Sequence, residues 1–187
     1  MTVVAVVASA ATLQRLSLDQ MSSLATAVVR ARVTGSSASL YPSPGSPTIY
    51  THYKLNVSEV WKGAAVSEVM LPGGEADGRR QSFPGVPELR VGAEYILFLW
   101  KSPSTGIIHT MGLTQGIFGV TAQADGSALV GRLQSGELML DESGNRVSDR
   151  AISMKMAEMR ALLGRVPAAS SSGAVRAPGP GASGTPK

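Results

Sequence analysis

Apolar and polar residues alternate along 53–58, which is the period of a strand with one buried face. The alternation then breaks, because Val60 and Trp61 are adjacent and both apolar. One extra residue near 58–59, a β-bulge, would turn Val57, Val60 and Trp61 inward. Because bulges bend strands, and small barrels need bent strands, this break favours a strand that curls around a barrel.

Six other segments show strand patterns. The segment 92–100 is almost continuously apolar, as in a strand buried on both faces, while the others alternate or carry a turn signal at their centre. Loops are predicted where Pro, Gly and Ser gather, at 36–47 and 73–89. The predicted strands lie within 26–35, 65–74, 92–100, 107–113, 115–133 and 137–147.

Two helices flank these strands. Ser17 and Gln20 have the spacing of a capping box, which predicts a helix over 18–24. A second helix is predicted over 149–163, with Ser148 as its N-cap. Its apolar residues recur at helical spacing and form a packing face. We therefore expect a mainly β fold: a small antiparallel OB-like barrel with a short N-terminal helix and a longer C-terminal helix.

The two ends of the chain differ from this domain. Residues 1–10 form a short apolar run closing on a small-x-small pattern, which predicts a signal peptide with a truncated n-region. The alternatives are a start further upstream or an apolar N-terminal strand. Residues 165–187 are rich in Ala, Ser, Gly and Pro and are predicted to be disordered. The barrel domain is assigned to 11–164, and we expect a secreted or periplasmic bacterial protein without a membrane span after processing.

Charge and cysteine content restrict the function classes. The formal net charge is +4, but 165–187 contribute three basic residues and no acid. The remaining chain has 14 basic and 13 acidic residues, a net of +1, which makes nucleic acid an unfavoured partner. The absence of cysteine excludes disulfides and thiolate metal sites.

Few residues have a pattern that indicates chemistry. The two histidines, His52 and His109, have no neighbouring ligands at metal-site spacing, and no G-x-S-x-G motif is present. We therefore expect no cofactor, no metal and no enzymatic activity. The candidate binding residues are basic: Arg79 and Arg80 as a clamp for an anion, and Arg30 and Arg32 on the polar face of a strand.

Three segments together resemble the core of the netrin-type module, the OB-like barrel of tissue inhibitors of metalloproteinases. They are LATAVVRARV (24–33), YTHYKLNVSEVWKG (50–63) and VGAEYILFLW (91–100). The chain is also similar to a group of uncharacterised bacterial secreted proteins that combine the WKG strand with PGVPELRVGAEYILFL and GLTQGIFGV. The resemblance covers about residues 16 to 140.

The resemblance implies a protein-binding function, with a metalloprotease as one candidate partner. The inhibitors use an N-terminal cysteine whose α-amine reaches the protease zinc, and this chain has no cysteine. Processing at Ala11 or Thr12 would nevertheless expose an α-amine able to bind zinc. The leading prediction is a non-enzymatic, protein-binding and inhibitor-like module. The alternatives are a hydrolase with an unrecognised site and an oligonucleotide-binding OB-fold.

Overall fold

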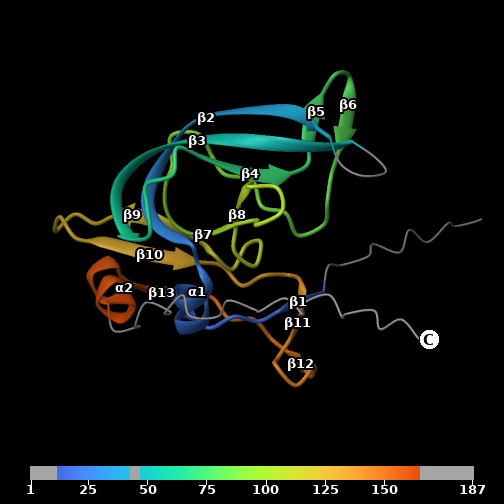
Figure 1. Ribbon diagram of the computed structural model, residues 1–187. Helices are drawn as coiled ribbons and strands as arrows, with labels where there is room; N and C mark the ends of the chain where they lie inside the picture. The colour runs from blue at the N-terminus through green and yellow to red at the C-terminus, as the bar shows by residue number, and fades with distance from the viewer. Residues whose placement is uncertain (1–11, 43–46, 165–187) are drawn as a thin grey trace, which may run out of the picture.

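The computed structural model describes residues 12–42 and 47–164, and the predicted signal peptide, Ala11 and the C-terminal tail lie outside them. The described chain is mainly β and contains two short helices (Figure 1). The elements are β1 (Thr12–Gln14), α1 (Leu18–Leu24), β2 (Ala27–Tyr41), β3 (Thr48–Lys62), β4 (Glu68–Pro72), β5 (Gly74–Ala76), β6 (Arg79–Gln81), β7 (Glu94–Lys101), β8 (Ile108–Thr110), β9 (Ile117–Ala122), β10 (Ala128–Arg132), β11 (Leu138–Leu140), β12 (Arg146–Val147), β13 (Ile152–Lys155) and α2 (Met156–Leu163).

The main sheet has the strand order β13-β10-β9-β7-β2-β3-β4, with β8 also paired to β7, and its strand pairs are antiparallel. This confirms the prediction of an antiparallel, mainly β fold. The hydrogen-bonded order ends at β4, and the described strands include no ladder between β4 and β8 that would close a barrel. The two strands are joined instead by a side chain, since His109 Nδ1 donates to the Met70 carbonyl oxygen at 3.0 Å.

The core lies on both faces of this sheet. The first cluster is enclosed by β2, β3, β4 and β7 and includes Val29, Tyr53, Leu71 and Leu97. The second cluster lies on the opposite face, where Phe98 and Phe118 are covered by methionines of α1 and α2. Strand β7 contributes to both clusters, and its residues 96–99 are fully buried. Its continuously apolar sequence is explained by this two-sided burial.

The predicted bulge is present and is accompanied by two more. The register between β2 and β3 shifts at Ser58, as the sequence indicates, and also at Trp61 and at Thr34. Val60 pairs with Val29 but is 45% exposed, so its prediction as a core residue is wrong. Trp61 is partly buried and packs against the second cluster.

Strand β2 is longer than predicted. Residues 36–41, assigned to a loop from their Ser and Pro content, pair with β3 up to Tyr41–Thr48. Strand preference depends strongly on context, and the cross-strand partners here satisfy the backbone of a weakly strand-forming segment. The result is a long β2–β3 hairpin that extends beyond the rest of the sheet (Figure 1).

The first helix forms over the predicted residues and with the predicted cap. The Ser17 side chain accepts a hydrogen bond from the Gln20 backbone, and the Gln20 side chain accepts one from the Ser17 N–H at 2.8 Å. This capping box begins α1 at Leu18. Met21 of α1 is fully buried in the second cluster, which fixes the helix against the sheet.

The second helix is shorter than predicted, since α2 begins at Met156 and residues 152–155 form β13. Strand β13 pairs with β10, and this pairing outweighs the helical spacing of the apolar residues. Ser148 is therefore not an N-cap; Lys155 holds that position without a side-chain cap. The predicted packing face is nevertheless correct, because Ile152, Met156, Met159 and Leu163 all contact the second cluster.

Candidate functional site

The β5–β6 hairpin lies in a segment that the sequence assigns to a loop. Its two-residue turn is Asp77-Gly78, with φ angles of 51° and 69°, and Ala76 pairs with Arg79 across it. Positive φ at both central residues defines a type I′ turn, for which Asp-Gly is a preferred sequence. Figure 1 shows this hairpin at the far end of β2 and β3.

A tight corner attaches the hairpin to the long strands. Gly73 and Gly74 both have positive φ, and a Cβ atom on Gly74 would lie 2.6 Å from the Thr51 hydroxyl oxygen. That hydroxyl donates to the Gly73 carbonyl oxygen at 2.8 Å. On β6, the Gln81 side chain accepts a hydrogen bond from the Ile49 backbone at 2.7 Å. These contacts fix the position of β6, and with it the position of Arg80.

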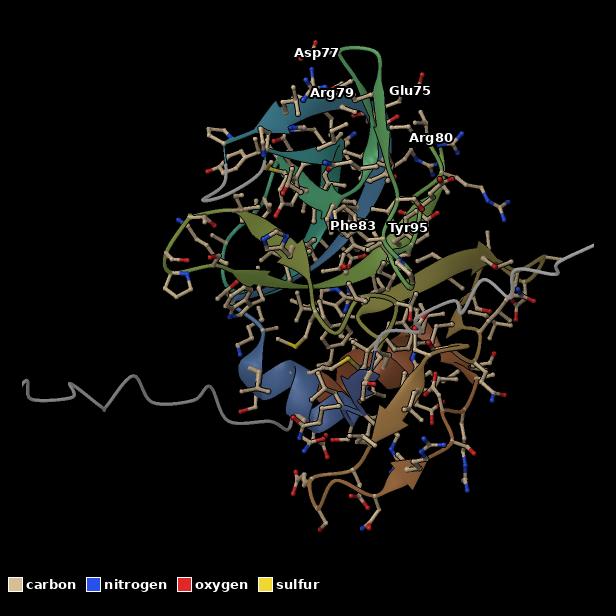
Figure 2. All side chains as sticks on the ribbon, turned by 90° about the vertical axis from the view of Figure 1, so that its right-hand side faces the viewer. Glu75, Asp77, Arg79, Arg80, Phe83 and Tyr95 are labelled. Atoms are coloured by element: carbon tan, nitrogen blue, oxygen red, sulfur yellow. The ribbon has the colours of Figure 1, made fainter. Side chains whose placement is uncertain are left out.

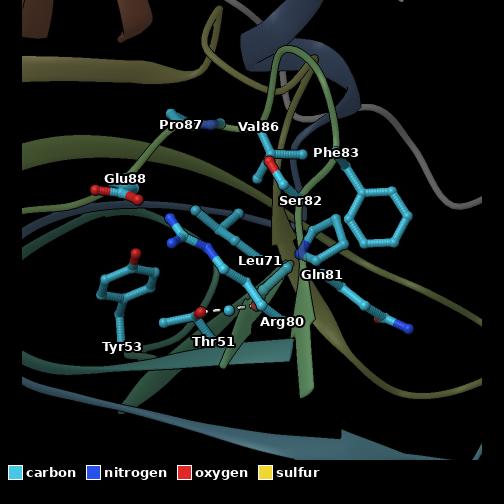
Figure 3. Close-up of a pocket in the computed structure, with 13 residues that line it drawn as sticks. Thr51, Tyr53, Leu71, Arg80, Gln81, Ser82, Phe83, Val86, Pro87 and Glu88 are labelled. Carbon is cyan, nitrogen blue, oxygen red and sulfur yellow. Dashed lines mark hydrogen bonds between the residues drawn. The ribbon is translucent and has the colours of Figure 1, made fainter. Parts of the chain in front are cut away.

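Below this corner lies a pocket of about 110 Å³ (Figure 3). It is bounded by the corner, by β6 and by the loop that follows β6. Figure 3 shows the Arg80 side chain extending toward the Tyr53 hydroxyl and the Glu88 carboxylate, with Phe83 pointing away. The lining includes Thr51, Tyr53, Leu71, Arg80, Val86 and Glu88.

Arg80 and Glu88 place opposite charges in the pocket without forming an ion pair. Within the described ranges, neither side chain has an oppositely charged partner within 4 Å. Glu75, directly opposite Arg80 on β5, is not within that distance either. Figure 2 shows Glu75 and Arg80 on one side of the hairpin and Arg79 on the other. Arg80 therefore keeps its guanidinium available for a ligand, while Arg79 faces away.

Tyr53 supplies a neutral hydroxyl to this pocket. Burial raises the pKa of Tyr53 above its usual value, and the nearby Glu88 carboxylate raises the pKa further, while a backbone hydrogen bond at Leu89 opposes the shift. The phenol is therefore protonated at neutral pH. It can donate a hydrogen bond to an anionic group held by Arg80.

The other predicted arginines have different surroundings. Arg30 makes two hydrogen bonds to the Glu94 carboxylate, at 3.0 and 3.1 Å, and a third to Glu59 at 2.9 Å. Arg32 lies 4.0 Å from Glu94. Arg160 pairs with Glu59 and lies over the Trp61 ring. Because the glutamates neutralise Arg30, these residues form a structural ion-pair network rather than the basic face that the oligonucleotide alternative requires.

Thr12, the described residue of the predicted N-terminal site, lies in another part of the molecule. Thr12 belongs to β1, which pairs in parallel with β11 at Leu138, in a small sheet completed by β12. The Leu16 N–H donates to the buried Gln115 side chain at 2.8 Å, and Gln115 donates in turn to the Gln14 carbonyl at 2.9 Å. The small sheet and the Arg80 hairpin occupy opposite ends of the molecule (Figure 1). The candidate residues therefore do not form one site.

Both histidines make hydrogen bonds to residues of neighbouring strands. No cluster of three or more His, Asp or Glu residues with metal-site geometry occurs in the described part of the chain. Burial lowers the pKa of His109, against the effect of its hydrogen bond to Met70. His52 contacts Ser39 and Glu68, at 2.8 and 2.9 Å.

Neither described helix has the length and apolar character needed to cross a membrane.

Comparisons with protein-family models and with curated proteins find no match to this chain. The resemblance to the netrin-type module therefore stays a prediction from its sequence motifs.

Sequence reasoning named Arg80 as a candidate but missed its surroundings. Tyr53 has the pattern of a core residue, and Glu88 lies in a segment of loop composition. The Asp77-Gly78 dipeptide was the available signal, because it predicts a hairpin that separates Arg79 from Arg80 onto opposite faces. The contribution of the loop at 82–88 depends on tertiary folding and has no local signal.

Proposed function

We propose that this chain is a secreted or periplasmic binding module built on an OB-like barrel. The motifs that resemble the netrin-type module support the barrel assignment. So does the arrangement of β2, β3, β4, β7 and β8 around the first apolar cluster, to which Ile108 of β8 also packs. The proposed role is non-enzymatic at the Arg80 pocket, where the module holds part of a protein partner without altering it.

The observation that supports this role is the Arg80 guanidinium at the pocket, which has no carboxylate within 4 Å among the residues that the structure describes. Small-molecule sites usually have volumes of about 300–1,000 Å³, so a pocket of about 110 Å³ fits one side chain better than a whole cofactor. Arg80 and the Tyr53 hydroxyl are both donors, which favours a carboxylate. Phe83, 40% exposed, lies at the edge of the pocket, directed away from the Arg80 guanidinium, and provides apolar contact area there. An acidic side chain or the terminal carboxylate of a protein matches this chemistry.

The experiment compares two neighbouring arginines. Wild-type protein, Arg80→Ala and Arg79→Ala are immobilised and exposed to the extracytoplasmic fraction of the native organism, and bound proteins are quantified by mass spectrometry. A hydrogen bond to a charged group contributes about 1.5–3 kcal/mol, so Arg80→Ala should weaken capture of the partner about ten- to hundredfold. Arg79→Ala should capture it as the wild type does.

Two results would contradict the proposal. Capture that is equal for wild type and Arg80→Ala would exclude the pocket as the contact. An equal loss in both variants would indicate binding through the general charge of the hairpin.

Export is tested separately, by mass spectrometry of the native protein. An N-terminus near Ala11 is expected, and an intact Met1 in the cytosolic fraction would refute export.

A metalloprotease is the partner class that the resemblance favours, and the position of Thr12 adds one observation. If processing ends near this residue, pairing of β1 with β11 holds the segment that carries the α-amine. An α-amine has a pKa near 7.7–8.0, so part of it is neutral at physiological pH and able to bind zinc. The mature protein is assayed against secreted zinc metalloproteases with and without N-terminal acetylation. Inhibition that survives acetylation would exclude the amine mechanism.

A further inference from the structure

Three side chains outside the pocket form a hydrogen-bonded chain across neighbouring strands. Ser39 Oγ on β2 lies 2.8 Å from His52 Nε2 on β3, and His52 Nδ1 lies 2.9 Å from Glu68 Oε1 on β4. All three belong to the main sheet, in the order β2-β3-β4. Ser39 is exposed, and the other two residues are partly buried.

The strand register explains why the three side chains meet. Tyr53 and Leu55 of β3 face the first core cluster, so His52 projects from the opposite face of the sheet. Ser39 pairs directly with Tyr50, two residues from His52, and is therefore its diagonal neighbour on the same face. Glu68 pairs with Lys54 and reaches His52 from the other side.

The arrangement has the three roles of an activated nucleophile. With the His52 proton assigned to Nδ1, the Ser39 hydroxyl donates to Nε2 and Nδ1–H donates to the Glu68 carboxylate. The carboxylate then fixes the ring orientation, and the free lone pair of Nε2 can accept the serine proton. Exposure of Ser39 leaves its oxygen accessible to a substrate.

We propose that Ser39 is the nucleophile of an acyl-transfer site that hydrolyses aryl esters, with His52 as general base and Glu68 as the residue that positions His52. This site is separate from the Arg80 pocket and gives the hydrolase alternative a specific location.

The reaction proceeds in two balanced steps. The Ser39 oxygen forms a bond to the acyl carbon while its proton passes to His52 Nε2, and the phenol leaves with the proton that His52 returns. Water then attacks the acyl-serine with His52 again accepting the proton. This step releases the carboxylic acid and restores the Ser39 hydroxyl.

The surroundings of Ser39 select the leaving group. Ser39 lies inside a strand that pairs with β3, and not at a turn where neighbouring N–H groups converge to stabilise an oxyanion. The site therefore favours esters whose leaving group is already good. Tyr50, opposite Ser39, and Tyr41, next on the same face, pack edge to face at 5.8 Å and provide an aromatic surface beside the nucleophile. An aryl ester satisfies both conditions.

The test uses 4-nitrophenyl acetate and the full chain. Wild type should release 4-nitrophenol faster than buffer, and Ser39→Ala should reduce the rate to background. His52→Gln should lower it about a hundredfold or more, the usual contribution of a general base. Ser37→Ala is the matched control, because Ser37 lies on the same strand and pairs with His52 in the register, yet does not bond to it; its rate should equal that of wild type.

A second measurement does not depend on any variant folding. Wild-type protein is treated with a fluorophosphonate, which modifies activated serines, and the labelled peptide is mapped by mass spectrometry. The expected label is on Ser39. Absence of labelling, labelling at another residue, or a folded Ser39→Ala variant that hydrolyses the ester at the wild-type rate would overturn the proposal.

Discussion

Replacing Asp149 with asparagine tests whether a buried ion pair stabilises the segment that leads into β13. Arg132, at the end of β10, makes two hydrogen bonds to the Asp149 carboxylate at 2.6 and 2.8 Å. The Ser135 backbone N–H donates to the same carboxylate at 2.8 Å. The two side chains are only 5% and 2% exposed. Loss of the negative charge would leave the Arg132 guanidinium buried without its counter-ion.

The magnitude follows from the pKa of Asp149. Burial alone would raise this pKa, but the hydrogen bonds from Arg132, Ser135 and Arg150 and the Arg132 charge lower it from 3.8 to about 2. This lowering of the pKa corresponds to roughly 2 kcal/mol of stabilisation. Since the folded-state pKa is depressed, this stabilisation is present above pH 4 and is lost as pH falls through 2. Breaking a buried pair typically costs about 3–5 kcal/mol, which we expect for Asp149→Asn at pH 7.

Urea unfolding, followed by tryptophan fluorescence, measures this cost at pH 7 and at pH 2. The difference in unfolding free energy between wild type and Asp149→Asn should shrink by about 2 kcal/mol at the lower pH, because the wild-type carboxylate becomes protonated. Asp125→Asn, in the exposed β9–β10 turn, is the control and should cost less than about 0.5 kcal/mol. Equal stability of Asp149→Asn and wild type at pH 7, or a difference independent of pH, would refute the reasoning.

Three further substitutions test other parts of the fold. Trp61→Ala should cost about 2–3 kcal/mol, below the ~3–5 kcal/mol of a fully buried aromatic, and unchanged stability would show that the ring does not support the second cluster. Lys62→Ala should cost about 1 kcal/mol in urea unfolding, because its ammonium donates to two carbonyls at the end of α1; a neutral result would contradict that role. Gly74→Ala should lower the melting temperature more than Gly78→Ala, since both have positive φ but only Gly74 would clash with Thr51, and equal losses would argue against the tight corner.

Most strands and the first helix could be predicted because their sequence signals are local. The capping box at Ser17 and the turn between β9 and β10 involve residues close in sequence, and the structure confirms both. The segment 149–155 shows the limit of this reasoning. Its apolar spacing fits a helix, but Asp149 binds a partner 17 residues away and 152–155 pair with β10. Neither interaction has a signal within the segment itself.

The Arg80 pocket shows that local sequence signals also limit the prediction of function. A pair of arginines in a Gly-rich segment predicts an anion clamp, but this composition alone does not distinguish Arg79 from Arg80; only the hairpin indicated by Asp77-Gly78 does. The hairpin makes them different by placing them on opposite faces. The neutralisation of Arg30 has a similar origin, since Glu59 and Glu94 approach it from strands on either side of β2. Whether an arginine is free to bind a ligand thus depends on which strands lie beside it in the sheet. The sequence of one strand does not show which strands these are.

The bulge at Thr34 links the fold to the proposed nucleophile. Before it, the odd-numbered residues of β2, including Val29 and Val33, face the first core cluster. The register shift between Val33 and Gly35 reverses this phase. Ser39, which would otherwise face the core, therefore projects outward beside His52. A slip of one residue moves every later side chain to the other face, so the Ser39–His52–Glu68 chain depends on one irregularity that alternation alone does not predict.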